Sequence, residues 1–252
     1  MKSWYKRLCL LATSLIVFTG HSQTILIDPG HGGSDCGAKA QVKMNGQTRT
    51  ICEKDLALQI AKRIKEHLDD DFKVFLTRSV DRDISLQERA DIAERVQADI
   101  FLSVHLNASS ARASHGYETF YLNNHENAAV QRLESIENRD SEGDQIVINQ
   151  ILADLVIERT APRSKKLAGL IHQHINTRVQ NKYNLVDRGK KPALFYVLAL
   201  SKRPAALLEA GFITNDNEIH TILSKSFQED YAKSVAQGVR KYFKKQQSPS
   251  IF

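Results

Sequence analysis

Apolar residues along this chain alternate between short unbroken runs and stripes at helical spacing. Unbroken runs of four to eight apolar residues are typical of buried strands, whereas apolar residues recurring every three or four positions indicate amphipathic helices. Helices are predicted from Glu53, from Leu86 and from about Ser226. Strands interleaved with helices predict an α/β fold with a sheet covered by helices on both faces. The predicted strands are residues 24–28, 72–78, 100–106, 116–122, 193–200 and 205–212.

One segment, residues 123–162, does not follow this alternation. Its first half is polar and charged, with the sequence NNHENAAVQRLESIENRDSEGD. Its second half carries a stripe at helical spacing, which predicts an insertion of two helices. The stripe consists of Ile148, Ile151, Leu152 and Leu155.

The first residues resemble a secretory signal. Lys2, Lys6 and Arg7 precede an apolar core from Leu8 to Phe18, and small residues follow near Ser22. The apolar core is shorter than the roughly 20 residues that a membrane span needs. We therefore expect a signal peptide over residues 1–22, one domain over 23–246, a loose tail over 247–252, and a secreted or periplasmic protein without a membrane span.

Charge and cysteine content narrow the classes of function. Removing the signal takes away three basic residues and no acidic one, which lowers the formal charge from +6 to +3. That charge is too weak to indicate a nucleic-acid partner, but it is compatible with approach to an anionic cell-wall polymer. Cys36 and Cys52 are the two cysteines beyond the signal, and the sequence leaves open whether they form a disulfide or stay free thiols.

Candidate chemistry gathers where the predicted strands end. His31 follows the first strand, His105 ends the third, Glu209 lies at the end of the last, and Glu53 opens the first helix. In α/β sheets, functional groups lie just past the carboxyl ends of strands. Two histidines and a carboxylate are a common three-ligand set for catalytic zinc, which would leave Glu209 to transfer protons.

Each of these residues also has a purely structural interpretation. A histidine near a strand end is more often a hydrogen-bonded structural residue, and Glu209 could be a buried carboxylate paired with an arginine. Glu53 fits a capping box that begins at Thr50 and would serve only to start the helix. The four residues form no compact motif, so their spacing alone does not decide between the interpretations.

Six blocks, in order, resemble the zinc-dependent N-acetylmuramoyl-L-alanine amidases of bacterial cell-wall turnover, a family that includes the cell-separation amidases. The blocks depart from the family pattern at Cys36, where a proline is common, and at Leu106, where a small residue is usual. The resemblance implies a twisted, mostly parallel sheet between helices. The blocks are IDPGHGG (27–33), EKDLALQIA (53–61), TRSVDRDISLQERADIAE (77–94), ADIFLSVHLNA (98–108), RGKKPALFYVL (188–198) and PAALLEAGFITN (204–215).

Carried onto this chain, the family pattern makes His31, Glu53 and His105 the ligands of a zinc ion and Glu209 the catalytic carboxylate. The implied substrate is peptidoglycan, cleaved between N-acetylmuramic acid and L-alanine. Arg78 and Arg89 lie in a block that resembles the family, and they either bind substrate carboxylates or form structural pairs.

The insertion at about 123–162 resembles the regulatory segment of the cell-separation amidases in its stretches ENRDS (137–141) and ILADL (151–155). In those relatives a helix covers the groove, and an acidic side chain can occupy the open zinc position until a partner moves the helix. We expect Glu137 to be this latch, with Glu134 or Glu142 as substitutes, and a protein activator that acts on the insertion. The alternative is a surface excursion without regulatory effect.

Two other functions stay open on the sequence. A zinc peptidase or deacylase would act on another cell-wall amide, and an inactive wall-binding regulator would need no working site. All four chemical residues are present, which favours an enzyme. We expect it to be a monomer.

Overall fold

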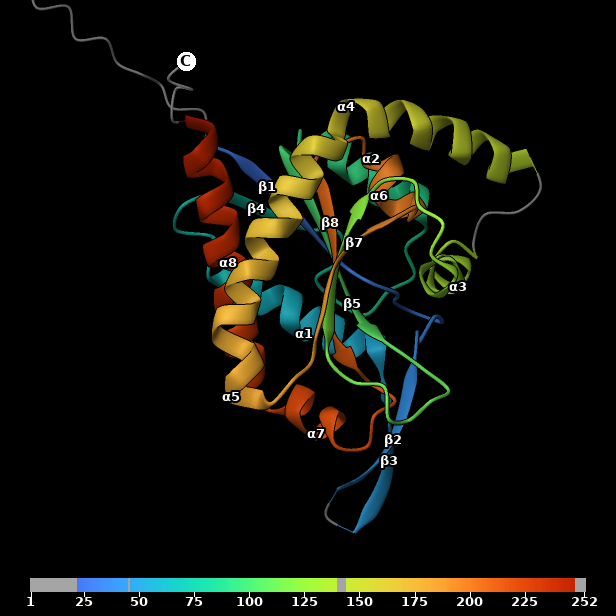
Figure 1. Ribbon diagram of the computed structural model, residues 1–252, viewed down its shortest axis with the longest axis vertical. Coiled ribbons are helices and arrows are strands. Elements are labelled where there is room, and N and C mark those ends of the chain that lie inside the picture. Colours follow the sequence, from blue (N-terminus) through green and yellow to red (C-terminus); the bar gives the residue numbers. More distant parts are fainter. Residues whose placement is uncertain (1–21, 45, 140–143, 248–252) are drawn as a thin grey trace, which may run out of the picture.

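The computed structural model describes residues 22–44, 46–139 and 144–247, and a six-stranded sheet runs through its centre (Figure 1). Neighbouring strands are parallel except where β6 meets β8. This mostly parallel sheet between helices confirms the predicted α/β class. Across the sheet the order is β4 (Lys73–Leu76), β1 (Thr24–Pro29), β5 (Ile100–Asn107), β8 (Ala205–Phe212), β6 (Tyr117–Leu122) and β7 (Asp187–Ala193).

Helices cover both faces of this sheet. One face is covered by α1 (Glu53–Glu66), α8 (Lys225–Gln247) and the second half of α4 (Asp144–Ile175), and the other by α2 (Leu86–Arg95), α3 (Ala128–Glu137), α6 (Tyr196–Leu200) and the first half of α4. The remaining elements are short. They are the hairpin β2 (Lys39–Met44) and β3 (Gln47–Cys52), the π-helical turn η1 (Asn176–Gln180), α5 (Asn181–Tyr183) and α7 (Glu218–Leu223).

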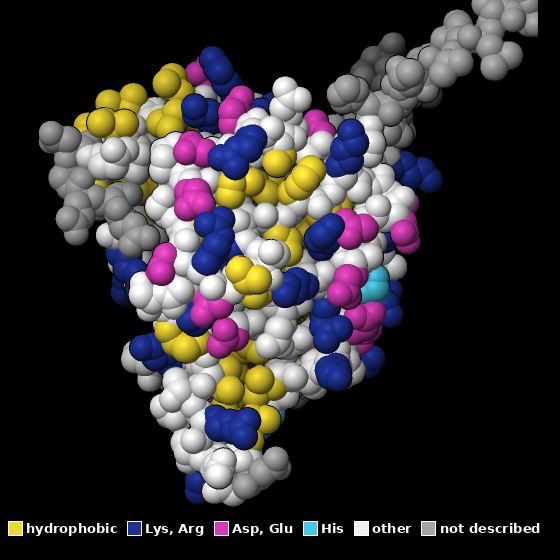
Figure 2. All heavy atoms as spheres, turned by 180° about the vertical axis from the view of Figure 1, so that it is seen from behind, with side chains coloured by type: hydrophobic (Ala, Val, Ile, Leu, Met, Phe, Trp, Pro, Cys, Tyr) yellow, Lys and Arg dark blue, Asp and Glu magenta, His cyan; other side chains and the backbone are white. Residues whose placement is uncertain are grey.

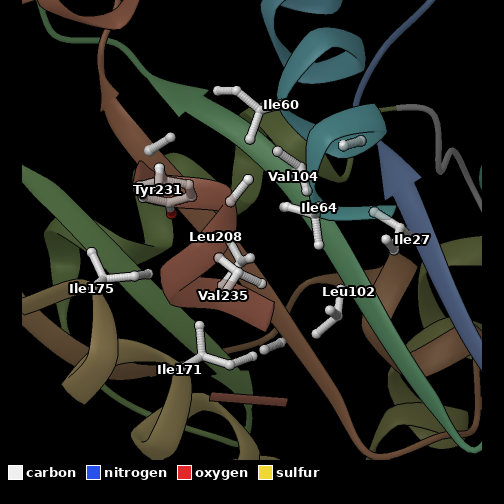
Figure 3. Close-up of a cluster of buried hydrophobic side chains, with 14 of the residues drawn as sticks. Ile27, Ile60, Ile64, Leu102, Val104, Ile171, Ile175, Leu208, Tyr231 and Val235 are labelled. Atoms are coloured by element: carbon white, nitrogen blue, oxygen red, sulfur yellow. The ribbon is translucent and has the colours of Figure 1, made fainter. Parts of the chain in front are cut away.

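The largest hydrophobic core lies between the sheet and α1, α4 and α8 (Figure 3). Residues two apart in a strand share a face, so Leu102 and Val104 point into this core while Phe101 points to the other. Each such fully buried aliphatic side chain stabilises the fold by about 1.5–3 kcal/mol relative to exposure. The side chains that meet here include Ile27, Ile60, Ile64, Leu102, Val104, Ile171, Ile175, Leu208, Tyr231 and Val235.

The strand predicted at 193–200 is wrong. β7 ends at Ala193, and Tyr196–Leu200 form the helix α6, whose residues are all buried. A short buried apolar run has no polar positions to reveal its period, so strand and helix cannot be told apart from it. The strand before it, DRGKKPA, is polar because β7 lies at the edge of the sheet, where Pro192 is also tolerated.

Residues 123–162 contain α3 and the first half of α4, the two helices that the sequence pattern predicts, and the second of them runs beyond this segment. α4 continues past Pro162 to Ile175, and its second half packs on the sheet and on α8. α4 bends along its length in Figure 1. Pro162 lacks a backbone N–H and crowds the preceding turn, which kinks a helix rather than ending it when tertiary contacts hold both halves.

Several expectations fall partly outside the described residues. The predicted signal, apart from Ser22, and the predicted tail, apart from Gln247, lie there, and Gln247 itself ends α8. Among the helices that the structure describes, none has the length and apolar character to cross a membrane.

Candidate active site

The loop after β1 presents His31 at the carboxyl end of the sheet. His31 adopts a left-handed backbone conformation with φ 56°, and Asp35 holds the ring through a 2.7 Å contact between Nδ1 and Oδ2. Gly30 gives the neighbouring strand room, because a Cβ there would lie 2.4 Å from the His105 ring. The other ring nitrogen of His31, Nε2, is buried and makes no hydrogen bond within the described residues.

Glu53 opens α1, but it does not cap it. The residue before it, Cys52, makes no side-chain capping bond, and both carboxylate oxygens of Glu53 bond to backbone groups outside α1. Oε2 accepts a hydrogen bond from Ala38 N at 2.8 Å, and Oε1 accepts one from Leu106 N at 2.9 Å. The capping-box interpretation is therefore wrong, and the backbone fixes Oε1 toward the two histidines.

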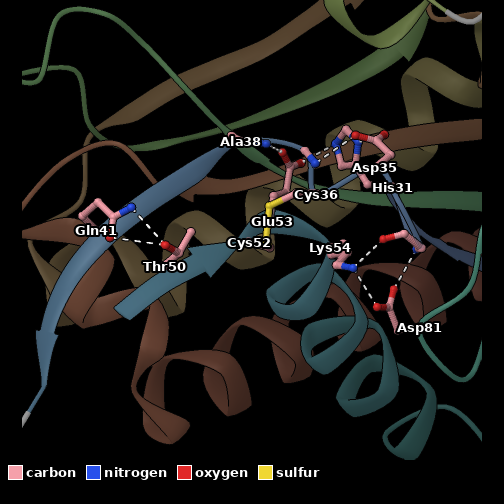
Figure 4. Close-up of a disulfide and its surroundings, with 12 residues drawn as sticks. His31, Asp35, Cys36, Ala38, Gln41, Thr50, Cys52, Glu53, Lys54 and Asp81 are labelled. Carbon is pink, nitrogen blue, oxygen red and sulfur yellow. Dashed lines mark hydrogen bonds and ion pairs between the residues drawn. A yellow bond between two sulfur atoms is a disulfide. The ribbon is translucent and has the colours of Figure 1, made fainter. Parts of the chain in front are cut away.

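A disulfide ties the two loops that carry these groups (Figure 4). Cys36 follows the His31 turn and Cys52 precedes Glu53, with their Cα atoms 5.1 Å apart. Of the two alternatives that the sequence left open, the structure has the disulfide and not two free thiols. It restricts how far the His31 loop can move from the start of α1.

Four side-chain atoms from four elements converge on one point. Glu53 Oε1 lies 3.1 Å from His31 Nε2 and 3.1 Å from His105 Nδ1. From α3, Glu137 Oε2 lies 3.3 Å from His105 Nδ1 and 3.8 Å from His31 Nε2. Ligands at the corners of a tetrahedral zinc site are about 3.3 Å apart, given metal–ligand bonds of roughly 2.0–2.2 Å. His31, His105 and Glu137 could hold a metal ion between them.

The electrostatics of this cluster favour a cation. Burial lowers the pKa of His31, but the carboxylates of Glu53, Asp35 and Glu137 outweigh it and raise the pKa to about 11. Burial raises the pKa of Glu53, yet His31 and His105 hold it well below its usual range. Excess negative charge in a buried site is costly unless a positive charge balances it. The unbonded Nε2, the donor set and the spacing all fit a zinc ion.

Glu209 lies beside this cluster on β8, in register with His105 on β5. Its side chain is buried, and Oε2 has no hydrogen-bond partner in the described part of the chain. Burial, followed by the charges of Glu53 and Glu137, raises its pKa well above the usual range. Among the residues that the structure describes, no arginine pairs with it, and a carboxyl group of this kind can accept and return a proton.

The two arginines considered for substrate binding are buried and bonded to the backbone beneath the His31 turn. Arg78 is 2% exposed and donates to the carbonyl oxygens of Pro29, Gly30 and Lys54. Arg89 is 5% exposed, pairs with Asp28 at 2.5 Å and donates to the carbonyl oxygen of His31. These bonds are the structural pairs that the sequence left open as one alternative, and Arg89 also lines the cleft beside His31. Both guanidinium groups satisfy the carbonyl oxygens of the turn that carries His31.

Side chains around the end of α3 fasten this helix to the body. Asn138 donates to the carbonyl oxygen of Leu194 and accepts from Tyr196 N, both at 2.8 Å. Glu134 pairs with His125 at 2.6 Å and accepts from Leu194 N, so it holds α3 rather than the metal cluster. Glu142 lies outside the described residues.

Arg139, next to these residues, pairs with Asp35, the partner of His31. The sequence analysis missed Asp35 and Arg139. The acidic residue four positions after His31 is a signal that could have pointed to Asp35.

Two clefts flank α3, one on each side. The first, about 260 Å³, is lined by His31, His105, Glu137 and the start of α2. The second, about 440 Å³, lies over the ends of β6 and β7. Ile136 of α3 lines both, so this helix divides what would otherwise be one groove.

Comparison with known proteins gives a consistent family. A family model described as N-acetylmuramoyl-L-alanine amidase matches residues 25–241. The chain is 30% identical to the N-acetylmuramoyl-L-alanine amidase AmiA of Escherichia coli over 89% of this chain and 78% of that protein.

Solved structures agree with the sequence relatives. An N-acetylmuramoyl-L-alanine amidase from Clostridium difficile superimposes with a TM-score of 0.65 at 31% identity, covering 88% of this chain and 97% of that one. The CwlD amidase from Clostridioides difficile, solved in complex with the GerS lipoprotein, gives a TM-score of 0.64 at 25% identity, covering 88% and 98%.

Proposed function

This chain belongs to the N-acetylmuramoyl-L-alanine amidase family and is a peptidoglycan amidase, and we propose that it works with a zinc ion held by His31, Glu53 and His105. The observation that carries the proposal is the convergence of His31 Nε2, His105 Nδ1 and Glu53 Oε1, with 3.1 Å from Glu53 Oε1 to each ring nitrogen. A zinc ion there would supply Lewis acidity, polarising the amide carbonyl and lowering the pKa of water.

The chain's own residues divide the remaining work. Asp35 orients the His31 ring, and the backbone N–H groups of Ala38 and Leu106 orient Glu53. Glu209 takes the proton of the attacking water and returns it to the amine of L-alanine as the amide bond breaks. Its raised pKa suits a group that must both accept and donate a proton near neutral pH.

We further propose that the enzyme is held inactive by α3. Glu137 Oε2 lies within 3.8 Å of both histidines, where a fourth ligand or the attacking water would be. Arg139, Asn138 and Glu134 hold the end of the helix in this position. With α3 in place, substrate could not span the two clefts, and Glu137 would occupy the position that the three proposed ligands leave open on a zinc ion.

An activator would have to move α3, and the first half of α4 offers it a surface. Figure 2 shows hydrophobic side chains gathered at the upper left, where this part of α4 projects. CwlD, solved with a lipoprotein, shows that a relative of this fold binds a protein partner. We propose a protein activator on this surface. The exposed side chains are Ile146, Val147, Ile148, Ile151 and Leu155.

The place of action follows from the substrate. Peptidoglycan lies outside the cytoplasmic membrane, and we propose that residues 1–22 direct secretion to the periplasm or the cell surface. This proposal rests on the basic, apolar and small-residue order of those residues. The monomeric state stays a prediction.

Digestion of purified sacculi tests the reaction. Metal-stripped and zinc-reloaded protein would be compared, with products identified by mass. We expect zinc to restore release of intact stem peptides that carry a free L-alanine amino terminus. Cleavage within the stem peptide, or loss of an acyl group from the sugar, would instead show a peptidase or deacylase. Full activity of the stripped protein would contradict zinc dependence.

A further inference from the structure

The second cleft beside α3 contains a charged group that the proposed reaction does not use. At its floor Glu118 of β6 is 5% exposed and is paired with both Arg188 and Lys191 of β7. Two cations around one carboxylate leave an excess of one positive charge. We call these three residues the cationic cleft.

The cationic cleft continues a row of residues that begins at the metal cluster. His105 on β5 is in register with Glu209 on β8, and Glu209 is in register with Glu118 on β6. Registered residues on adjacent strands point to the same face and have Cα atoms about 4.5–5.5 Å apart. The cleft is thus one strand beyond Glu209, on the side away from His105.

The two cations have bonding capacity left for a ligand. In the described residues, Arg188 is hydrogen-bonded only through Nε, to Glu118, so its two terminal nitrogens are available. The guanidinium carbon lies 5.0 Å from the centre of the Phe212 ring, within the range of a cation–π contact. Lys191 contacts Glu118 at 3.3 Å, and its side chain is 30% exposed. A planar guanidinium with free nitrogens suits a carboxylate.

We propose that Arg188 and Lys191 bind a carboxylate of the stem peptide and so set substrate preference. This inference rests on the proposed function. In a stem peptide the second residue, D-glutamate joined through its γ-carbonyl, has a free α-carboxylate. An extended chain advances about 3.3–3.6 Å per residue, so a peptide leaving Glu209 reaches the next strand within one to two residues. The α-carboxylate of this second residue is the group that we assign to the cleft.

The proposal also gives the substrate a direction across the sheet. The cleft on the other side of α3 is lined by Ser34, Asp83 and Ser85, whose oxygens suit the hydroxyl groups of a sugar. The glycan would therefore lie toward β1 and α2, and the peptide toward β6 and β7. The scissile amide would cross the row between His105 and Glu209.

Two matched muropeptides test this assignment. They differ only in the second residue, which is D-isoglutamate in one and its amide, D-isoglutamine, in the other. Zinc-loaded full-length protein is assayed with both, as wild type and with Glu137→Ala to uncover the groove. We expect kcat/KM to be roughly ten-fold higher for the carboxylate, with most of the difference in KM. Equal values for the two substrates would overturn the proposal.

Variants then test whether Arg188 and Lys191 cause the preference for the carboxylate substrate. Arg188→Gln and Lys191→Gln together should abolish it by raising KM for the carboxylate substrate and leaving the amide substrate nearly unchanged. Lys190→Gln is the matched control, because Lys190 lies on the same strand but over Tyr121 on the opposite face, and it should keep the preference. If the pair had a purely structural role, the double variant would lower kcat/KM equally for both substrates, and that result would overturn the assignment.

A final variant guards against misfolding. Removing both cations leaves Glu118 buried and unpaired, so Arg188→Gln with Lys191→Gln and Glu118→Gln restores a neutral cleft. This triple variant should fold and cleave both muropeptides equally. A preference that persists in the triple variant would overturn the proposal. If Glu137→Ala, with the groove uncovered, cleaved neither muropeptide at the muramoyl amide, the proposed function itself would fail, a result distinct from equal cleavage of both.

Discussion

The carboxylate of Glu137 lies 3.3 Å from Nδ1 of His105, although the two residues belong to a surface helix and a central strand. Arg139 pairs with Asp35, which in turn contacts His31, so the same helix end reaches both histidines. Movement of α3 would therefore change the surroundings of both proposed ligands at once. Under the proposed function, regulation and metal binding would be coupled through these side chains.

Releasing Glu137 should raise activity without removing zinc. A closed state favoured by ~2–3 kcal/mol leaves about one to a few per cent of molecules open, so Glu137→Ala should raise sacculus hydrolysis by some tens of fold. Zinc content and dye release from labelled sacculi are measured together. Glu126→Ala, an exposed change just before α3, should leave the basal rate unaltered. Unchanged activity in Glu137→Ala with zinc retained would reject the latch.

Removing the proton acceptor should affect rate and leave metal binding intact. Glu209→Gln preserves the shape of the side chain, and we expect kcat to fall about 10²–10⁴-fold with one zinc still bound. Glu94→Gln, on the surface of α2, is the control. Loss of zinc from Glu209→Gln would mean that Glu209 is a ligand and would put the role of Glu53 in doubt.

The disulfide should contribute to stability and to the metal site. The bond closes a loop with a sequence separation of 16, and a loop of that length is worth about 3 kcal/mol in the chain-entropy model. Cys36→Ser with Cys52→Ser should lower the melting temperature by roughly 6–12 °C for a protein of this size. Calorimetry measures the melting temperature, and a zinc titration should show that the double variant binds zinc more weakly than wild type. A melting temperature equal to that of oxidised wild type would contradict it.

Stability should fall as pH rises through the range in which Glu218 titrates. Burial raises the pKa of Glu218 to about 7, although hydrogen bonds from Gly116 N and Phe212 N and the charges of His115 and Arg188 oppose the shift. Between the usual pKa near 4.5 and about 7, the folded protein binds the proton and the unfolded chain does not. The free energy of unfolding therefore decreases with rising pH across this window.

Glu218→Gln tests that assignment, since the amide cannot titrate. Urea unfolding at pH 5 and pH 7.5 should show a smaller difference in the variant than in wild type. Glu158→Gln, on the exposed side of α4, is the control. An identical pH difference in Glu218→Gln and wild type would show that other groups cause it.

The sequence predicted most of what depends on local pattern. Periodic apolar positions located α1 and α2, and Ser85 caps α2 as expected, with its side chain accepting from Glu88 N at 3.1 Å. The first strand ends at Asp28-Pro29-Gly30, which places His31 at the carboxyl end of the sheet, where His105 and Glu209 also lie. The end of a strand is a local property, so the sequence alone could predict it.

Contacts between residues far apart in the sequence were harder to predict. The apolar run 193–200 lacked a period, and the strand beside it was polar because it lies at the sheet edge. The role of Arg78 depends on carbonyl oxygens of residues up to 49 positions away, which no local pattern encodes. Arg139 and Asp35 were likewise brought together only by the fold.

Anomalous diffraction at the zinc edge from zinc-loaded crystals tests the central claim most directly. We predict one zinc peak about 2.0–2.2 Å from His31 Nε2, His105 Nδ1 and Glu53 Oε1, with Glu137 Oε2 as the fourth ligand. In Glu137→Ala the peak should stay in place with a water in the fourth position. The absence of a peak between the two histidines, or a zinc bound there without Glu53, would contradict the account.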